Sequence, residues 1–300
     1  MTPFNHIGEQ EFETTYLMFG RNDSELVGIK NWSSGQNRVQ RFKLNSAGKL
    51  KPIGESILNE DGRTVDGLVM AGNHHFIVTE RGNEPYGGVI QYYEFTDGGV
   101  KKSYGPYPTR NFIDSPSMSK GFLMGDTVVD NHGTFLSIYN LNMQPQVMFT
   151  KKMPSFRKAI WLNSVSGILT IGDSLGVYNW NPEDFDLNKF DCSLSETINN
   201  HLNQDRKFNR SIGSVLQTPD NKLIFGVRAY DNSPGVHGAK CSLVFTKDYV
   251  SSLLGPAKVS DDLISDVQEF DSANNLILSP SGKLLVSYGT SAGINIYKRD

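Results

Sequence analysis

Two segments of the chain combine arginine, tyrosine and asparagine with prolines and glycines, which is the composition of a recognition surface. The first covers residues 80–88 and the second covers residues 228–238. Tyrosine and arginine offer large contact areas and several hydrogen bonds, and they are enriched among the residues that dominate binding energies. The alternative is that both segments are surface insertions that the fold tolerates. The candidate binding residues in these segments are Arg81, Tyr86, Arg228, Tyr230 and His237.

A repeated unit positions both segments. Residues 276–289 contain an apolar run, a Pro-Ser-Gly turn and a second apolar run, and residues 215–226 repeat this pattern around Pro219, Asp220 and Asn221. Proline fixes φ, while Asp, Asn, Ser and Gly close tight hairpins. A third strand follows each pair of apolar runs and carries an aromatic residue at one position. These aromatic residues are Phe42, Tyr93, Tyr139, Tyr178, Phe245 and Tyr297.

The spacing of the six aromatic residues predicts an all-β, six-bladed β-propeller. They recur at intervals of roughly 40 to 50 residues, with one longer step, which is the range of propeller repeats. Short β-branched and aromatic runs punctuated by Gly, Asn, Asp and Pro favour strands throughout. We therefore expect residues 1–300 to form a single propeller domain. Because the sixth unit ends at Asp300, just after its third strand, we expect a strand from residues 7–12 to close the ring, the alternative being a three-stranded last blade.

The expected blade topology places the two segments on one face of the ring. Loops between the second and third strands emerge on the same face as the connections between blades, and residues 80–88 and 228–238 are such loops in the opposed second and fifth units. Two long connections between blades are also expected on this face, at residues 193–202, where a capping box predicts a short helix, and at residues 253–270. His74 and His75 are expected in a polar turn on the opposite face.

The composition limits the classes of partner. Lys and Arg total 29 against 32 Asp and Glu, the net charge is −3 and the pI is near 6.1, so nucleic-acid binding is not expected. No signal peptide and no apolar run of about 18 residues is found, so we expect no membrane insertion and a chain that is cytoplasmic or part of a soluble or viral assembly. Cys192 and Cys241 form no C-x-x-C pair and indicate neither a disulfide framework nor a zinc site.

The turns of the repeat carry a resemblance to known propellers. The sequences Ser-Pro-Ser-Gly-Lys at residues 279–283 and Thr-Pro-Asp-Asn-Lys at residues 218–222 resemble the Ser-Pro-Asp-Gly-Lys blade turn of WD40 and lactonase-like β-propellers. The Gly-His and Trp-Asp pairs of WD40 blades do not recur in this chain. The resemblance is therefore to the β-propeller superfamily, and it identifies no specific family.

The lactonase-like resemblance implies a metal site as an alternative. Such enzymes hold a divalent ion in the central channel through carboxylates at the starts of inner strands, which in this chain implies Asp66, Asp114 and Asp266 as ligands. Oxygen ligands of this kind suit Ca²⁺ or Mg²⁺. Against this, Arg157 and Arg210 stand at the starts of the fourth and fifth units, where their charges would oppose a bound cation.

Two functional hypotheses follow. The favoured one is a non-catalytic recognition or scaffold propeller that needs no cofactor and binds a protein or a glycan through the face with the two long loops, alone or within a larger assembly. The alternative is a metal-dependent, lactonase-like hydrolase that acts in the central channel. No phosphate-binding loop or His-Glu-x-x-His helix is present to favour another enzyme class.

Overall fold

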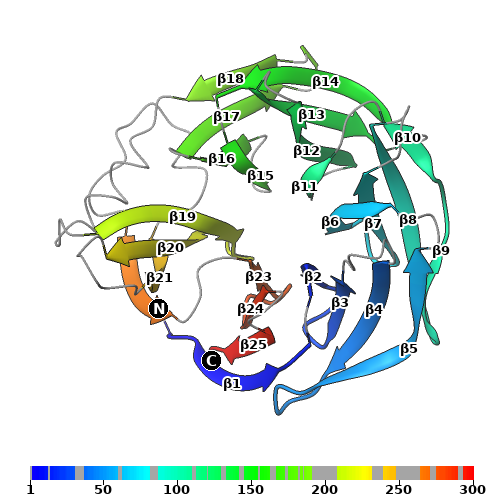
Figure 1. The fold of residues 1–300 in the computed structure, drawn as a ribbon. Coiled ribbons are helices and arrows are strands. Elements are labelled where there is room, and N and C mark those ends of the chain that lie inside the picture. Colours follow the sequence, from blue (N-terminus) through cyan, green and yellow to red (C-terminus); the bar gives the residue numbers. More distant parts are fainter. Residues whose placement is uncertain are drawn as a thin grey trace.

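In the computed structural model, six antiparallel sheets formed by the described residues stand around a central axis (Figure 1). The first strand of each sheet lies nearest the axis and the fourth lies at the rim, so the sheets are the blades of a six-bladed β-propeller. The described residues are 2–12, 14–30, 37–59, 63–81, 87–109, 113–119, 121–129, 133–141, 145–154, 156–162, 167–172, 175–181, 183–184, 186–190, 208–231, 239–247, 264–270, 275–289 and 293–300.

The first half of the chain forms blades 1 to 3. Blade 1 contains β2 (Tyr16–Phe19), β3 (Glu25–Lys30), β4 (Asn37–Leu44) and β5 (Leu50–Asn59). Blade 2 contains β6 (Thr64–Met70), β7 (His75–Arg81) and β8 (Gly88–Thr96), and both β9 (Gly99–Lys102) and β10 (Tyr107–Thr109) pair with β8. Blade 3 contains β11 (Asp114–Ser119), β12 (Phe122–Val129), β13 (Gly133–Asn140) and β14 (Gln146–Met153).

The second half forms blades 4 to 6. Blade 4 contains β15 (Phe156–Leu162), β16 (Gly167–Gly172), β17 (Leu175–Asn181) and β18 (Asp186–Phe190). Blade 5 contains β19 (Phe208–Gln217), β20 (Leu223–Asp231), β21 (Ala239–Thr246) and β22 (Ile264–Phe270). Blade 6 contains β23 (Leu276–Leu278), β24 (Leu284–Gly289) and β25 (Gly293–Lys298), with β1 (Asn5–Gln10) at its outer edge.

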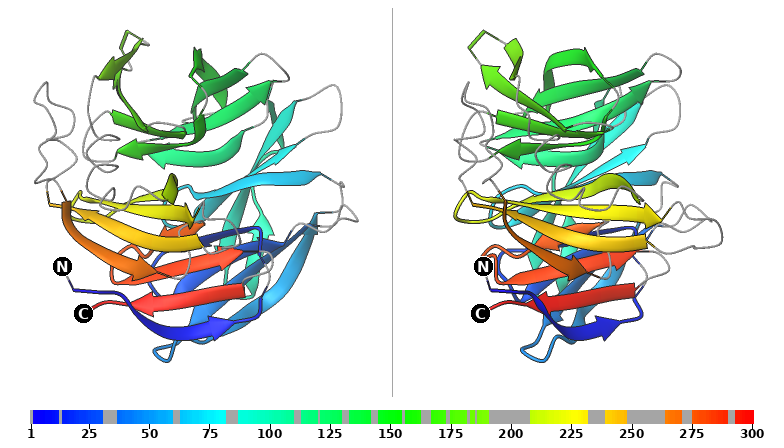
Figure 2. Two further views of the ribbon diagram at one scale, coloured as in Figure 1. Left: turned by 60° about the vertical axis from the view of Figure 1, so that its left-hand side comes forward. Right: turned by 90° about the vertical axis from the view of Figure 1, so that its left-hand side faces the viewer.

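The ring is closed by the N-terminal strand. Strand β1 pairs antiparallel with β25, from Asn5 opposite Lys298 to Gln10 opposite Ile294, and the two ends of the chain lie close together (Figure 2). The expected closure is confirmed, with the strand two residues nearer the N-terminus than predicted. Phe4 extends the junction, because its backbone N–H donates to Gln268 and its carbonyl accepts from the same amide side chain. The first and last strands therefore complete one blade.

The six repeated aromatic residues are buried in the third strands of the six blades, as predicted. The core lies between neighbouring blades, where apolar residues of two sheets pack together. Tyr178 on β17, for example, belongs to a cluster that includes Met124 and Leu136 of blade 3 and Ile168 of blade 4. The aromatic residues are Phe42, Tyr93, Tyr139, Tyr178, Phe245 and Tyr297, all at most 6% exposed.

The repeat turns have the backbone chemistry that their sequences predict. Asn221 and Gly282 occupy the left-handed region, with φ of 61° and 74°, and close the first hairpins of blades 5 and 6. The backbone N–H groups of Thr218 and Ser279 donate across these turns to Lys222 and Leu284. Equivalent turns recur in adjacent blades because each blade repeats the same hairpin.

Two expectations about the connections between blades have different outcomes. The prediction that residues 253–270 form a connection is wrong for residues 264–270, which form β22, the outermost strand of blade 5. The helix predicted near residues 193–202 lies outside the described residues. In the part of the chain that the structure describes, no helix has the length and apolar character needed to cross a membrane.

Replacing Tyr178 with alanine should lower the free energy of unfolding by about 3 to 5 kcal/mol, because it opens a cavity between blades 3 and 4. Tyr178→Phe is the matched control, since it keeps the ring and removes only the hydroxyl that bonds Thr170, and it should cost about 0.5 to 1.5 kcal/mol. Denaturant unfolding measures both values. A loss below about 1 kcal/mol for the alanine variant would contradict the assigned packing.

Gly8→Ala should weaken ring closure. A Cβ at Gly8 would lie 2.4 Å from the carbonyl oxygen of Gly48, in the turn between β4 and β5, so backbone must move, at a cost of about 1 to 3 kcal/mol. Gly98→Ala is the control, because a Cβ there meets nothing within 4 Å. Thermal and denaturant unfolding compare the variants, and equal stabilities would show that β1 does not pack on blade 1 as described.

Candidate ligand-binding site

The three predicted binding residues that the structure describes all lie on strands. Arg81 is the last residue of β7, with a half-exposed side chain, and Arg228 lies inside β20 opposite Cys241. The backbone of Tyr230 also belongs to β20, opposite Ala239. The prediction that residues 228–231 lie in a loop is therefore wrong, because β20 extends to Asp231. Tyr86 and His237 lie outside the described residues.

Arg81 is held by a buried carboxylate at the inner edge of blade 2. Its Nη2 donates to Oδ1 of Asp66 at 3.1 Å and its Nε donates to Oδ2 at 3.4 Å. Next to this pair, buried Glu80 forms an ion pair with Arg63 at 3.5 Å. A two-pronged contact between a guanidinium and a carboxylate is strong and directional. Asp66 therefore serves to orient Arg81, and Arg81 occupies both oxygens that a metal ion would need.

The three implied metal ligands do not share one site. Asp66 and the backbone of Asp114 lie on the inner strands β6 and β11 of neighbouring blades. Asp266 lies on β22, at the rim of blade 5, where its carboxylate accepts from the N–H of Val267, so the expectation that it starts an inner strand is wrong. Among the described residues, no group of three or more His, Cys, Asp or Glu side chains could hold a metal ion. The implied calcium or magnesium site does not fit these residues.

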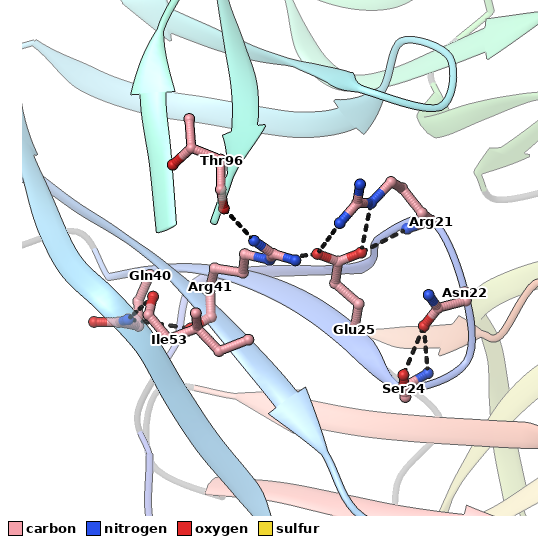
Figure 3. A network of polar contacts seen from close by, with 8 residues as sticks. All are labelled: Arg21, Asn22, Ser24, Glu25, Gln40, Arg41, Ile53 and Thr96. Carbon is pink, nitrogen blue, oxygen red and sulfur yellow. Dashed lines mark hydrogen bonds and ion pairs between the residues drawn. The ribbon is translucent and has the colours of Figure 1, made fainter. Parts of the chain in front are cut away.

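A second charged cluster joins blades 1 and 2 (Figure 3). Glu25 on β3 is buried, and it forms ion pairs with Arg21 at 3.0 Å and with Arg41 of β4. Burial alone would raise the pKa of Glu25, but the hydrogen bonds and charges of the two arginines outweigh it and lower that pKa. Arg41 also donates to the carbonyl of Thr96, and both guanidinium groups lie over the ring of Phe95 in blade 2. These charges satisfy each other and act as a link between blades.

A candidate site for a ligand is a pocket lined by aromatic side chains between blades 2 and 3. It has a volume of about 280 Å³ and opens at the end of β7 opposite to Arg81, beside the turn that contains His74. This is the face that the sequence analysis did not favour. We call it the tyrosine pocket, and its lining residues are Ala71, His75, Tyr92, Tyr104, Tyr107 and Leu141.

An interrupted outer strand builds the tyrosine pocket. Strands β9 and β10 pair with opposite halves of β8, and between them the N–H of Tyr92 donates to the carbonyl of Tyr104 at 2.9 Å. The side chain of Gln91 donates to the same carbonyl at 2.7 Å. Gly105 then adopts φ of 101°, a conformation that other residues rarely reach. The break in the strand leaves the ring of Tyr104 60% exposed.

The rings of the pocket meet at steep angles. The centroid of Tyr92 lies 6.4 Å from that of Tyr104 and 6.1 Å from that of Tyr107, with interplanar angles of 80° and 89°. His75 lies 5.9 Å from Tyr104. These distances are normal for edge-to-face aromatic pairs. Tyr92 and Tyr107 also cover the apolar core between blades 2 and 3, so a rigid base supports the exposed ring of Tyr104.

The phenol of Tyr92 stays uncharged over a wide pH range. Burial raises the pKa of Tyr92 to about 12, and the nearby phenol of Tyr107 adds to the effect. The Tyr92 hydroxyl is therefore a hydrogen-bond donor and acceptor at any physiological pH. The nearest acid in the sheet register, Glu94, lies opposite His75 and is paired with Lys101 at 3.3 Å. The pocket thus combines aromatic rings with the hydroxyls of three tyrosines and the imidazole of His75.

The sequence contains a signal for this pocket, but the residue types alone did not distinguish its tyrosines from the other candidate binding residues. Tyr92, Tyr104 and Tyr107 occur within one short segment around a Gly-Pro pair. The expected polar turn at His74 and His75 is present as a turn, but His75 also lines the pocket. Recognising the site requires knowing that residues 103–106 interrupt the edge of blade 2.

Comparison with known proteins supports the fold alone. No protein-family model and no curated protein matches the chain. A crystal structure of a protein from Lactobacillus plantarum matches 96% of this chain and 81% of its own length, with a TM-score of 0.55 and 10% sequence identity. At this identity the likeness shows the β-propeller architecture and carries no argument about ligands.

The raised tyrosine pKa values predict a loss of stability in alkali. Above pH 10 the unfolded chain releases phenol protons that the folded chain retains, so the free energy of unfolding falls until about pH 12. Tyr92→Phe should make this fall shallower, and Tyr139→Phe, which removes another phenol with a pKa of about 12, is the positive control. Denaturant unfolding between about pH 9 and pH 11 tests this, and identical slopes for wild type and both variants would contradict it.

Proposed function

We propose that the protein is a non-catalytic recognition propeller that binds a protein or a glycan without a cofactor. The observation that carries this proposal is the tyrosine pocket, where a rigid ring of blades presents an exposed aromatic ring and neutral hydrogen-bonding groups. Binding sites are typically concave and mainly apolar, with a few well-placed polar groups. Loops and edges on a rigid scaffold are also the usual place for functional residues.

The face of the ring that carries Arg81, which we call the loop face, is the second candidate recognition surface. Arg81 is half-exposed and is oriented by Asp66, which suits a side chain that contacts a partner. Its position at the end of β7 places it beside the segment that contains Tyr86. The two faces can be compared directly because they lie at opposite ends of the same strand.

The metal-dependent hydrolase receives less support from the described residues. The contact of Arg81 with both oxygens of Asp66, and the position of Asp266 at the rim, weigh against a shared carboxylate site. Metal analysis of protein purified without a chelator separates the hypotheses. One bound Ca²⁺ or Mg²⁺ per chain, lost on replacing Asp66 with asparagine, would favour the hydrolase.

Binding measurements on two variants should show which face recognises the partner. Tyr104→Ala should weaken binding to a partner recovered from the native source by about thirtyfold, which corresponds to the loss of about 2 kcal/mol at an interface anchor. The double variant Tyr86→Ala, Tyr230→Ala reports on the loop face. Val147→Ala, an exposed change on the outer strand of blade 3, is the control and should leave affinity unchanged.

The outcomes of this comparison are distinct. A loss with Tyr104→Ala alone supports recognition through the tyrosine pocket, and a loss with the double variant alone moves recognition to the loop face. The Tyr104→Ala and Val147→Ala variants should unfold at the wild-type temperature, because exposed changes usually alter stability by within about 0.5 kcal/mol. Unchanged binding by both tyrosine variants would contradict recognition through either face.

A further inference from the structure

We infer that the tyrosine pocket binds a single neutral sugar ring of a glycan. The inference rests on the proposed recognition function and specifies its ligand. Three features of the pocket support it: an exposed tyrosine beside two further rings, hydrogen-bonding groups with no Asp, Glu, Lys or Arg among the described lining residues, and a volume suited to one small ring. Each feature excludes a different competing class of ligand.

The exposed face of Tyr104 is suited to stacking. Sugar rings present C–H groups on one side, and these pack against the electron-rich face of an aromatic ring, while the sugar hydroxyls remain free for hydrogen bonds. Among the described residues, the other large apolar side chains with high exposure are Val147 and Val267, on the rim strands β14 and β22. Tyr104 differs from them because it stands beside two further rings, Tyr92 and Tyr107, in a concave surface.

The polar groups of the pocket match hydroxyls rather than ions. The hydroxyls of Tyr92, Tyr104 and Tyr107 each donate and accept hydrogen bonds, and the imidazole of His75 adds a further polar edge. Within the described part of the chain, no Asp, Glu, Lys or Arg lines the pocket. A ligand that carries a full charge would therefore be desolvated without a counter-charge, whereas a neutral sugar would not.

The charges around the pocket also disfavour a cation held by the rings. Aromatic rings attract ammonium groups, and several rings at steep angles are one arrangement that does so. However, among the described residues no Asp or Glu lines the pocket, and Glu94, which lies opposite His75 on the neighbouring strand, is paired with Lys101. A cationic ligand would therefore meet no unpaired carboxylate in the lining. The local electrostatics therefore favour a neutral ligand.

The size of the pocket favours one ring over an extended chain. Its volume of about 280 Å³ lies just under the range of about 300 to 1,000 Å³ typical for drug-sized ligands. Proline-rich peptides, which also stack on tyrosines, bind in extended grooves lined by several aromatic residues in succession. A glycan can instead insert one terminal sugar and leave the rest of the chain in solvent.

The test is a binding titration with neutral sugars. Methyl glycosides of glucose, galactose, mannose and N-acetylglucosamine, together with an array of larger glycans, are measured against the wild type, Tyr104→Ala and Tyr104→Phe by ligand-observed NMR and calorimetry. At least one neutral sugar should bind, Tyr104→Ala should weaken it by about tenfold or more, and Tyr104→Phe should retain affinity within about threefold because the stacking ring remains. Wild-type unfolding temperatures for both variants would exclude a folding defect.

Three results of these titrations would overturn the inference. Tyr104-dependent binding of tetramethylammonium, of a polyproline peptide or only of acidic sugars would show a different ligand class. If the native partner requires Tyr104 but no neutral sugar or array glycan binds, the glycan inference fails and the proposed recognition function stands. If neither sugars nor the native partner depend on Tyr104, the tyrosine pocket is not the recognition site.

Discussion

Closure of the ring by β1 and β25 is the constraint on which the rest of the structure depends. The apolar clusters of this protein lie between blades, so each blade buries its faces only when both neighbours are in place. A ring interrupted at one junction would expose two such faces and the edge of β25. The ion pairs of Glu25 with Arg21 and Arg41, stacked on Phe95, add a polar link of the same kind between blades 1 and 2. The stability of each blade is therefore a property of the whole ring.

This dependence restricts where the protein can carry a ligand site. The repeated aromatic residues of the third strands are buried between blades, and changing them alters packing in two sheets. Residues at strand ends and at the rim are less constrained, and the best-defined pocket arises there. Across the break between β9 and β10 the backbone of Tyr92 still bonds to Ser103 and Tyr104, and the inner strands of blade 2 are intact. The fold thus gains a tyrosine-lined surface without weakening its core.

The sequence predicts the parts of the fold that follow from alternating apolar residues. The six aromatic residues identify the third strands, and the number of blades and the closing strand follow from them. The end of β20 was not predictable in this way, because residues 228–231 pair through their backbones and carry no apolar alternation. Asp266 was misplaced for a related reason, since its strand reads as polar. The tyrosine pocket depends on residues from β7, the edge of blade 2 and the end of β13, and only their convergence makes a site.

The pairing of β1 with β25 joins strands that lie far apart in the chain. Residues 5–10 precede all the other strands of the propeller in the sequence, and their partner strand, residues 293–298, follows them. Strand β1 therefore cannot form its hydrogen bonds with β25 until the strands of all the other blades have been synthesised. Closure of the ring thus requires the first and the last strand of the propeller to meet.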